Sequence, residues 1–145
     1  MRLNNRKTTQ RGSSLVESAL VLLTFLLMVI GAIDFAQVIY FQQSLVERAR
    51  AALRYAVTVD PSAKTTEIKN MAVYNTTTPG VGATAILSGL TTGMVSVATS
   101  GSNTTEALVV VTISGFPMRF YSPYIYQGFT NQSISVAGTA ETLVP

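Results

Sequence analysis

The residues that could carry out chemistry are few and scattered in this chain of 145 residues. It contains no histidine and no cysteine, which removes imidazole acid–base chemistry, thiol nucleophiles, disulfides and Cys/His zinc sites. The acids of its C-terminal part stand far apart, at Glu47, Asp60, Glu67, Glu106 and Glu141. A serine–lysine pair on Lys64 or Lys69 is a formal alternative, but no motif points to it. A membrane-tethered hydrolase therefore has little support.

One acid differs from the others because it falls inside an apolar run. Residues 15–33 read LVESALVLLTFLLMVIGAI, and Glu17 is their one charged residue. A carboxylate in or at the edge of a bilayer costs about 2.5–3.5 kcal/mol on insertion scales. Either Glu17 lies shallow enough to reach headgroups and water, or it pairs with a cation in an assembled state. We favour the pairing.

The apolar run itself predicts a helix that crosses a membrane. At 1.5 Å per residue it would be about 28 Å long, close to the hydrocarbon thickness of a bilayer. A buried core helix is a weaker interpretation, because so small a chain could hardly cover it. A cleaved signal peptide would have a shorter apolar core and a small-residue cleavage site, whereas here apolar residues continue past Asp34.

Positive charge gathers in front of this span. The net charge is +3, but from Ser13 onward six basic residues face seven acidic ones. The basic pI thus belongs to a short tail, and no nucleic-acid partner is expected. The tail places the N-terminus in the cytoplasm and the C-terminal part outside. Its basic residues are Arg2, Arg6, Lys7 and Arg11.

The helix is expected to continue far beyond the membrane. Apolar residues recur at steps of three and four up to Ala56, and no proline appears before Pro61. One helix is therefore predicted over residues 13–57, on the order of 65 Å long. Asp60 and Pro61 should end it and then cap and start a short second helix over residues 62–74. The repeated apolar positions are Val38, Phe41, Leu45, Ala49, Ala52, Leu53 and Ala56.

The rest of the chain predicts a small antiparallel sheet. Residues 75–93 carry loop signals, and strands are expected over 94–99, 107–114 and 133–142. The segment 107–114 is apolar on both faces, which predicts a central strand covered on both sides. Packed on the amphipathic part of the long helix, these strands give an α+β fold.

The stretch RGSSLVESALVLLTFLLMVIGAIDFAQVIYFQQSLVERARAALRYAV, residues 11–57, combines several features. Gly12 stands just before the span, Glu17 follows five residues later, and Asp34 comes directly after the span. A glutamine pair and an alanine- and arginine-rich end complete the pattern. This stretch resembles type IV prepilins and, more closely, the TadE-like proteins of tight-adherence (Flp) pilus systems, whose pilin-like fold agrees with the α+β expectation.

The resemblance implies cleavage by a prepilin peptidase between Gly12 and Ser13, on the cytoplasmic side. Ser13 becomes the new N-terminus, with N-methylation left open, and Glu17 becomes the fifth mature residue. Two departures stand out: Ser18 replaces a common aromatic residue, and the C-terminal half matches only as a Ser/Thr-rich sheet. Removing residues 1–12 leaves 133 residues, a length that favours a minor pilin or pseudopilin over a major Flp pilin.

The expected organisation is a basic leader over residues 1–12, a long helix over 13–57 with its span at about 15–33, and an extracytoplasmic domain over 58–145. The partners implied are the prepilin peptidase, the inner-membrane assembly platform, and other pilins or pseudopilins that pack by helix contact. The new Ser13 ammonium would pair with Glu17 of a neighbouring subunit. No cofactor or metal is expected. The location is the bacterial inner membrane, with incorporation into the extracellular pilus left open.

A second candidate surface lies between two predicted strands, in residues 115–131. A loop of this length is usually functional, and tyrosine favours places where one end is apolar and the other wet. We expect a contact surface, with a flap over the protein's own sheet as the alternative. Its aromatic residues, half of the twelve in the chain, are Phe116, Phe120, Tyr121, Tyr124, Tyr126 and Phe129.

Two smaller features receive plain structural interpretations. Asp34 is expected in water at the outer end of the span, with a subunit contact as the alternative. Three glycosylation-like sequences, such as the one at Asn131, are attributed to composition.

Two functions of different kinds remain at this stage. One is a processed pseudopilin that joins or primes a secretion-linked pilus. The other is an uncleaved, membrane-anchored interaction module that binds an envelope or assembly protein. Cleavage after Gly12 separates the two.

Overall fold

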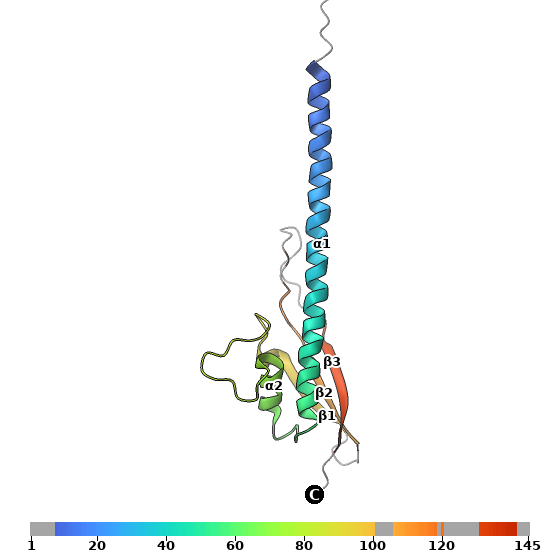
Figure 1. Cartoon of the computed structure of the whole chain (residues 1–145). Coiled ribbons are helices and arrows are strands. Elements are labelled where there is room, and N and C mark those ends of the chain that lie inside the picture. Colours follow the sequence, from blue (N-terminus) through green and yellow to red (C-terminus); the bar gives the residue numbers. More distant parts are fainter. Residues whose placement is uncertain (1–7, 101–105, 119, 121–130, 142–145) are drawn as a thin grey trace, which may run out of the picture. The chain divides into compact units, whose positions relative to one another are not determined.

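The computed structural model describes residues 8–100, 106–118, 120 and 131–141 (Figure 1). Its elements, in chain order, are helix α1 (Thr8–Ala56), helix α2 (Thr65–Tyr74), the 3-10 turn η1 (Thr92–Met94), and strands β1 (Val95–Ser100), β2 (Glu106–Ile113) and β3 (Ile134–Glu141). This confirms the predicted α+β fold. The chain forms two compact units, and the division between them falls inside α1, between Gln37 and Val38.

Helix α1 is continuous over 49 residues. It ends one residue before the predicted position and begins five residues earlier, at Thr8. The early start has a simple cause: Gly12 is the main helix breaker near this end, and one glycine costs a helix only about 1 kcal/mol. At the other end, the amide of Thr58 donates to the carbonyl of Tyr55 at 3.0 Å and closes the last turn.

Helix α2 starts later than the sequence predicts, and the predicted cap is wrong. Lys64 occupies the N-cap position and makes no side-chain capping bond. The Asp60 carboxylate instead accepts from the amide and hydroxyl of Ser62, at 2.9 and 2.6 Å, so it closes a separate local turn. At the C-terminal end Asn75 adopts the left-handed conformation (φ 58°), and its amide donates to the carbonyl of Met71 at 3.1 Å.

The three strands form one antiparallel sheet with β2 in the centre, as predicted. One face of β2 is buried, through Val109, Val111 and Ile113. The expectation that β2 is covered on both sides is wrong, because no helix lies over the other face within the described residues: Leu108 there is 39% exposed. On that face the hydroxyls of Thr112 and Ser135 hydrogen-bond to each other across the strands at 2.8 Å.

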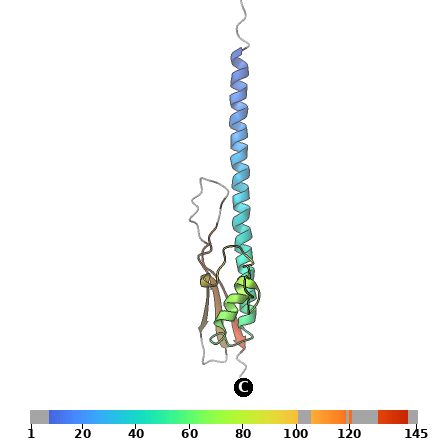
Figure 2. The same cartoon turned by 90° about the vertical axis from the view of Figure 1, so that its left-hand side faces the viewer.

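The core lies between the sheet, α2 and the C-terminal part of α1, which run alongside one another (Figure 2). A β-carbon added at Gly138 would meet Leu53 Cδ2 at 3.2 Å, so the glycine allows the helix to approach β3 closely. The predicted apolar face of the helix is confirmed. Its fully buried residues are Leu45, Ala49, Ala52 and Ala56, and those of α2 are Ile68, Ala72 and Val73.

Leu45→Ala should destabilise the C-terminal domain by about 2–5 kcal/mol, because Leu45 is 0% exposed and its removal leaves a cavity. The matched control is Leu22→Ala, the same change in the same helix at a side chain that is 58% exposed. Denaturant unfolding of the full chain in detergent micelles, followed by near-ultraviolet circular dichroism of the tyrosines, measures both. Equal losses in the two variants would contradict this assignment of the core.

Candidate functional site

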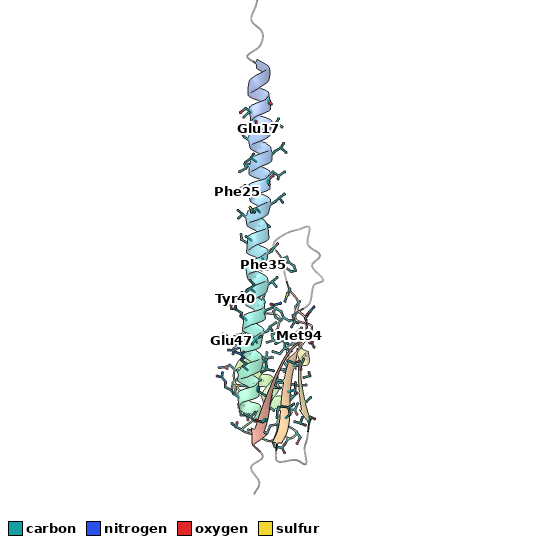
Figure 3. All side chains as sticks on the ribbon, turned by 90° about the vertical axis from the view of Figure 1, so that its right-hand side faces the viewer. Glu17, Phe25, Phe35, Tyr40, Glu47 and Met94 are labelled. Carbon is teal, nitrogen blue, oxygen red and sulfur yellow. The ribbon has the colours of Figure 1, made fainter. Side chains whose placement is uncertain are left out.

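The first turns of α1 hold the residues singled out from the sequence. Gly12, Ser13 and Glu17 are all helical and exposed. Ser13 and Glu17 are four residues apart, so they lie on one face of the helix. Within the described part of the chain, Glu17 makes no ion pair or hydrogen bond, and Figure 3 shows it near the start of α1. A carboxylate in this position is available to a group outside the chain.

Gly12 is not required by the fold. A β-carbon added there would meet no atom within 4 Å, and its backbone is ordinary helix. Alanine would stabilise this part of α1 by about 1 kcal/mol relative to glycine. The described fold would therefore accept a side chain at this position.

The helix after Gly12 presents a bare apolar surface. Leu15, Phe25 and Met28 are 73%, 59% and 76% exposed. The most apolar 18 residues of this helix have a mean hydropathy of 2.5, and only 6% of them are buried within the described chain. This segment is therefore not a core helix. It is long and apolar enough to cross a membrane, which suggests membrane anchoring.

Asp34 is not in water, contrary to the sequence expectation. Its side chain is only 3% exposed. Asp34 precedes Phe41 and Leu45 by seven and eleven residues, so the three positions share one face of α1. This spacing was already visible in the sequence.

The predicted contact loop is only partly described. Phe116 belongs to the core, 1% exposed with its ring centroid 5.5 Å from that of Phe41, so its assignment to a contact surface is wrong. Phe120 is half-buried. The other aromatic residues of this prediction lie outside the described residues: Tyr121, Tyr124, Tyr126 and Phe129.

Sequence reasoning missed the residue that closes the base of this loop. Asn131 is 6% exposed. Its side-chain oxygen accepts from the backbone amide of Phe116 at 2.6 Å, and its backbone amide donates to the carbonyl of Phe116 at 3.0 Å. A buried amide side chain held in this way cannot carry a glycan. The available signal was the position of this asparagine between a long loop and a strand. The sequence analysis attributed the residue to composition instead.

The ionisable groups at the far end of α1 serve to join the two helices. Tyr55 donates to one oxygen of Glu67, and the Lys64 ammonium lies 2.6 Å from the other. The Lys64 and Tyr55 hydrogen bonds lower the pKa of Glu67, and the Glu67 bond raises the pKa values of Tyr55 and Lys64. Hydrogen bonds from Ser62 likewise lower the pKa of Asp60. These interactions are structural.

No group of three or more potential metal ligands occurs within the residues that the structure describes. The arrangement therefore offers an apolar helix surface, an unpaired acid near its start and a glycine that the fold does not need. These are features suited to insertion, processing and helix packing.

Residues 12–54 match the model of a family described as TadE-like protein. The match begins at Gly12 and ends near the C-terminus of α1, so it covers the helix and leaves the sheet out. Neither the curated proteins nor the solved structures gave a match. The match spans 43 of the 145 residues, so this helical part of the chain is similar to that family.

The Glu67 contacts predict an acid-dependent loss of stability. Because the folded-state pKa of Glu67 lies below its ordinary value of 4.5, its contribution is present above that value and is lost as the pH falls through the folded pKa. Glu67→Gln should lower the melting temperature near neutral pH. It should also make the fall in melting temperature between neutral pH and about pH 3.5 smaller than in the wild-type chain. Thermal melts at both pH values measure this. If Glu67→Gln lost as much melting temperature on acidification as the wild-type chain, other carboxylates would be the cause of that loss.

Proposed function

We propose that this chain is a minor pilin or pseudopilin of a Flp (tight-adherence) type IV-like pilus. It would be made with a leader over residues 1–12 that a prepilin peptidase removes after Gly12. The observation that carries the proposal is the TadE-like match over residues 12–54, which starts at the boundary between the basic leader and the apolar helix. A bare apolar helix in front of a small packed domain supports it.

Cleavage at this position has a physical requirement. The Gly12–Ser13 bond lies in the second turn of α1, and a peptidase active site needs that turn to open locally. Gly12 lowers the cost of opening, because glycine weakens a helix by about 1 kcal/mol relative to alanine. This gives a function to a glycine that the fold does not require.

Cleavage also changes the charge at the start of the helix. It removes four basic residues that bind the anionic cytoplasmic leaflet and resist extraction of the subunit. It creates an ammonium at Ser13, and Glu17 of a neighbouring subunit is an exposed acid suited to neutralise it. Ser13 and Glu17 would thus form the charge pair of the assembled state.

The proposed topology has one membrane crossing, with the N-terminus in the cytoplasm and the domain formed by residues 58–145 in the periplasm. The partners would be the prepilin peptidase, the inner-membrane assembly platform and other pilins or pseudopilins. The role is structural, in assembly, adherence or secretion, with no catalytic step assigned to the chain.

Gly12→Leu should abolish leader removal, because a bulky side chain both strengthens the helix and blocks a glycine-specific active site. The full-length chain should persist in the membrane. Gly31→Leu is the matched control: a β-carbon at Gly31 also meets no atom within 4 Å, and this variant should be shortened normally. Intact mass of membrane-extracted protein reports the result. Normal shortening of Gly12→Leu would refute the cleavage site.

Glu17→Gln tests the charge pair separately from cleavage. If Glu17 neutralises a neighbour's Ser13 ammonium, its loss leaves that ammonium unpaired among apolar helices, which typically costs about 3–5 kcal/mol. Recovery with pilus components after crosslinking should then fall about a hundredfold or more, while cleavage persists. Wild-type recovery together with normal cleavage would rule the pair out. A failure of cleavage would instead place Glu17 among the residues that the peptidase recognises.

A further inference from the structure

The exposed apolar surface of α1 continues past Asp34, where the apolar run of the sequence ends. Phe35 and Tyr40 are 68% and 65% exposed, and Ile39 is 40% exposed. Figure 3 shows Phe35 and Tyr40 one after the other along α1. Exposed amide side chains begin only at Gln42. The apolar surface therefore extends about a turn and a half beyond Asp34.

Asp34 does not interrupt this surface, because the chain itself covers its side chain. Asp34 is 3% exposed, and Gln37, the next polar residue along α1, is half-buried. The compact unit that holds Asp34 also includes Phe120, from the segment between β2 and β3, and Phe120 is half-buried as well. Polar groups are tolerated at membrane depth where protein, and not lipid, surrounds them. Asp34 is thus no reason to end the membrane span at Ile33.

Two segments of α1 have the length that a bilayer needs. Residues 15–33 would be about 28 Å long and residues 19–39 about 31 Å, and the hydrocarbon core is about 30 Å thick. Their exposed polar side chains differ. The first segment contains Glu17, an exposed acid, whereas Thr24 is the one exposed polar side chain among residues 19–39, all of which the structure describes. The Thr24 hydroxyl donates to the carbonyl of Leu20 at 2.9 Å, so it needs no partner from the lipid.

We propose that lipid acyl chains surround residues 19–39 of α1, with Asp34 below the lipid–water boundary and Tyr40 at it. Tyrosine suits such a boundary, because its ring is apolar and its hydroxyl reaches water. Phe35 then contacts acyl chains instead of water, and Glu17 lies among the headgroups of the opposite face. The proposal rests on the membrane anchoring that this helix suggests and does not depend on cleavage of a leader.

Single cysteines test this boundary, because the natural chain has none. Purified full-length Phe35→Cys and Ala36→Cys chains, both changed at exposed positions, are placed at low density in vesicles of phosphatidylcholine and phosphatidylglycerol. A membrane-impermeant maleimide is added outside. Only chains with this end outward can react, so each result is read relative to Gln43→Cys, an exposed position beyond Tyr40.

Phe35→Cys and Ala36→Cys should react about tenfold or more slowly than Gln43→Cys, because a thiol reacts as its thiolate and apolar surroundings disfavour that ion. The matched control is Leu22→Cys, in the middle of the span, which should react as slowly. If Phe35→Cys and Ala36→Cys reacted as fast as Gln43→Cys, the boundary would lie at Asp34 and the proposal would be overturned.

A second readout identifies lipid as the material that covers these positions. The same cysteines are labelled with a bimane fluorophore, and brominated phosphatidylcholine replaces the ordinary lipid. Quenching should be strong at Phe35→Cys and Leu22→Cys and weak at Gln43→Cys. Slow maleimide labelling without quenching at Phe35→Cys would mean that protein covers it, which overturns the proposal. Neither measurement involves the prepilin peptidase, so this proposal and the proposed function can fail separately.

Discussion

The apolar surface of the N-terminal part of α1 is exposed among the residues that the structure describes. Full exposure of a side chain such as Leu23 or Phe25 to water instead of burial costs about 1.5–3 kcal/mol, and many such residues follow one another here. The sum exceeds the whole stability of an ordinary domain, about 5–15 kcal/mol. This exposed apolar segment suggests membrane anchoring.

One continuous helix meets two environments. Residues 19–33 of this helix are apolar except for Thr24, whereas after Val38 the helix has an inward face that packs on the sheet and an outward face that is polar. Leu45, Ala49 and Ala52 are fully buried in the core that α1 shares with α2 and the sheet. Helix α1 thus contains an apolar segment that suggests membrane anchoring and, after Val38, residues that form one wall of the core.

The sequence predicts most of this architecture because periodicity reports directly on burial. The inward face of α1, the end of α2 at Tyr74 and the central position of β2 all follow from apolar spacing. The errors came from local polar contacts. The Asp60 carboxylate can accept a hydrogen bond as a helix cap or, as it does here, within a local turn. The sequence around Asn131 is equally compatible with an exposed loop residue and with the buried hydrogen bond that forms. The Asp60 alternatives differ only in which nearby amide the carboxylate accepts from, and the Asn131 contact joins residues fifteen apart in sequence; apolar periodicity reports on neither.

We propose that this protein is synthesised with a leader and works as a shortened, membrane-anchored subunit. The intact mass of the wild-type chain extracted from membranes, in cells with and without the prepilin peptidase, tests this proposal. With the peptidase present we expect a mass lower by residues 1–12, with Ser13 at the N-terminus, and without it the full-length mass. A full-length chain in both cases would contradict it and would favour an uncleaved anchored interaction module.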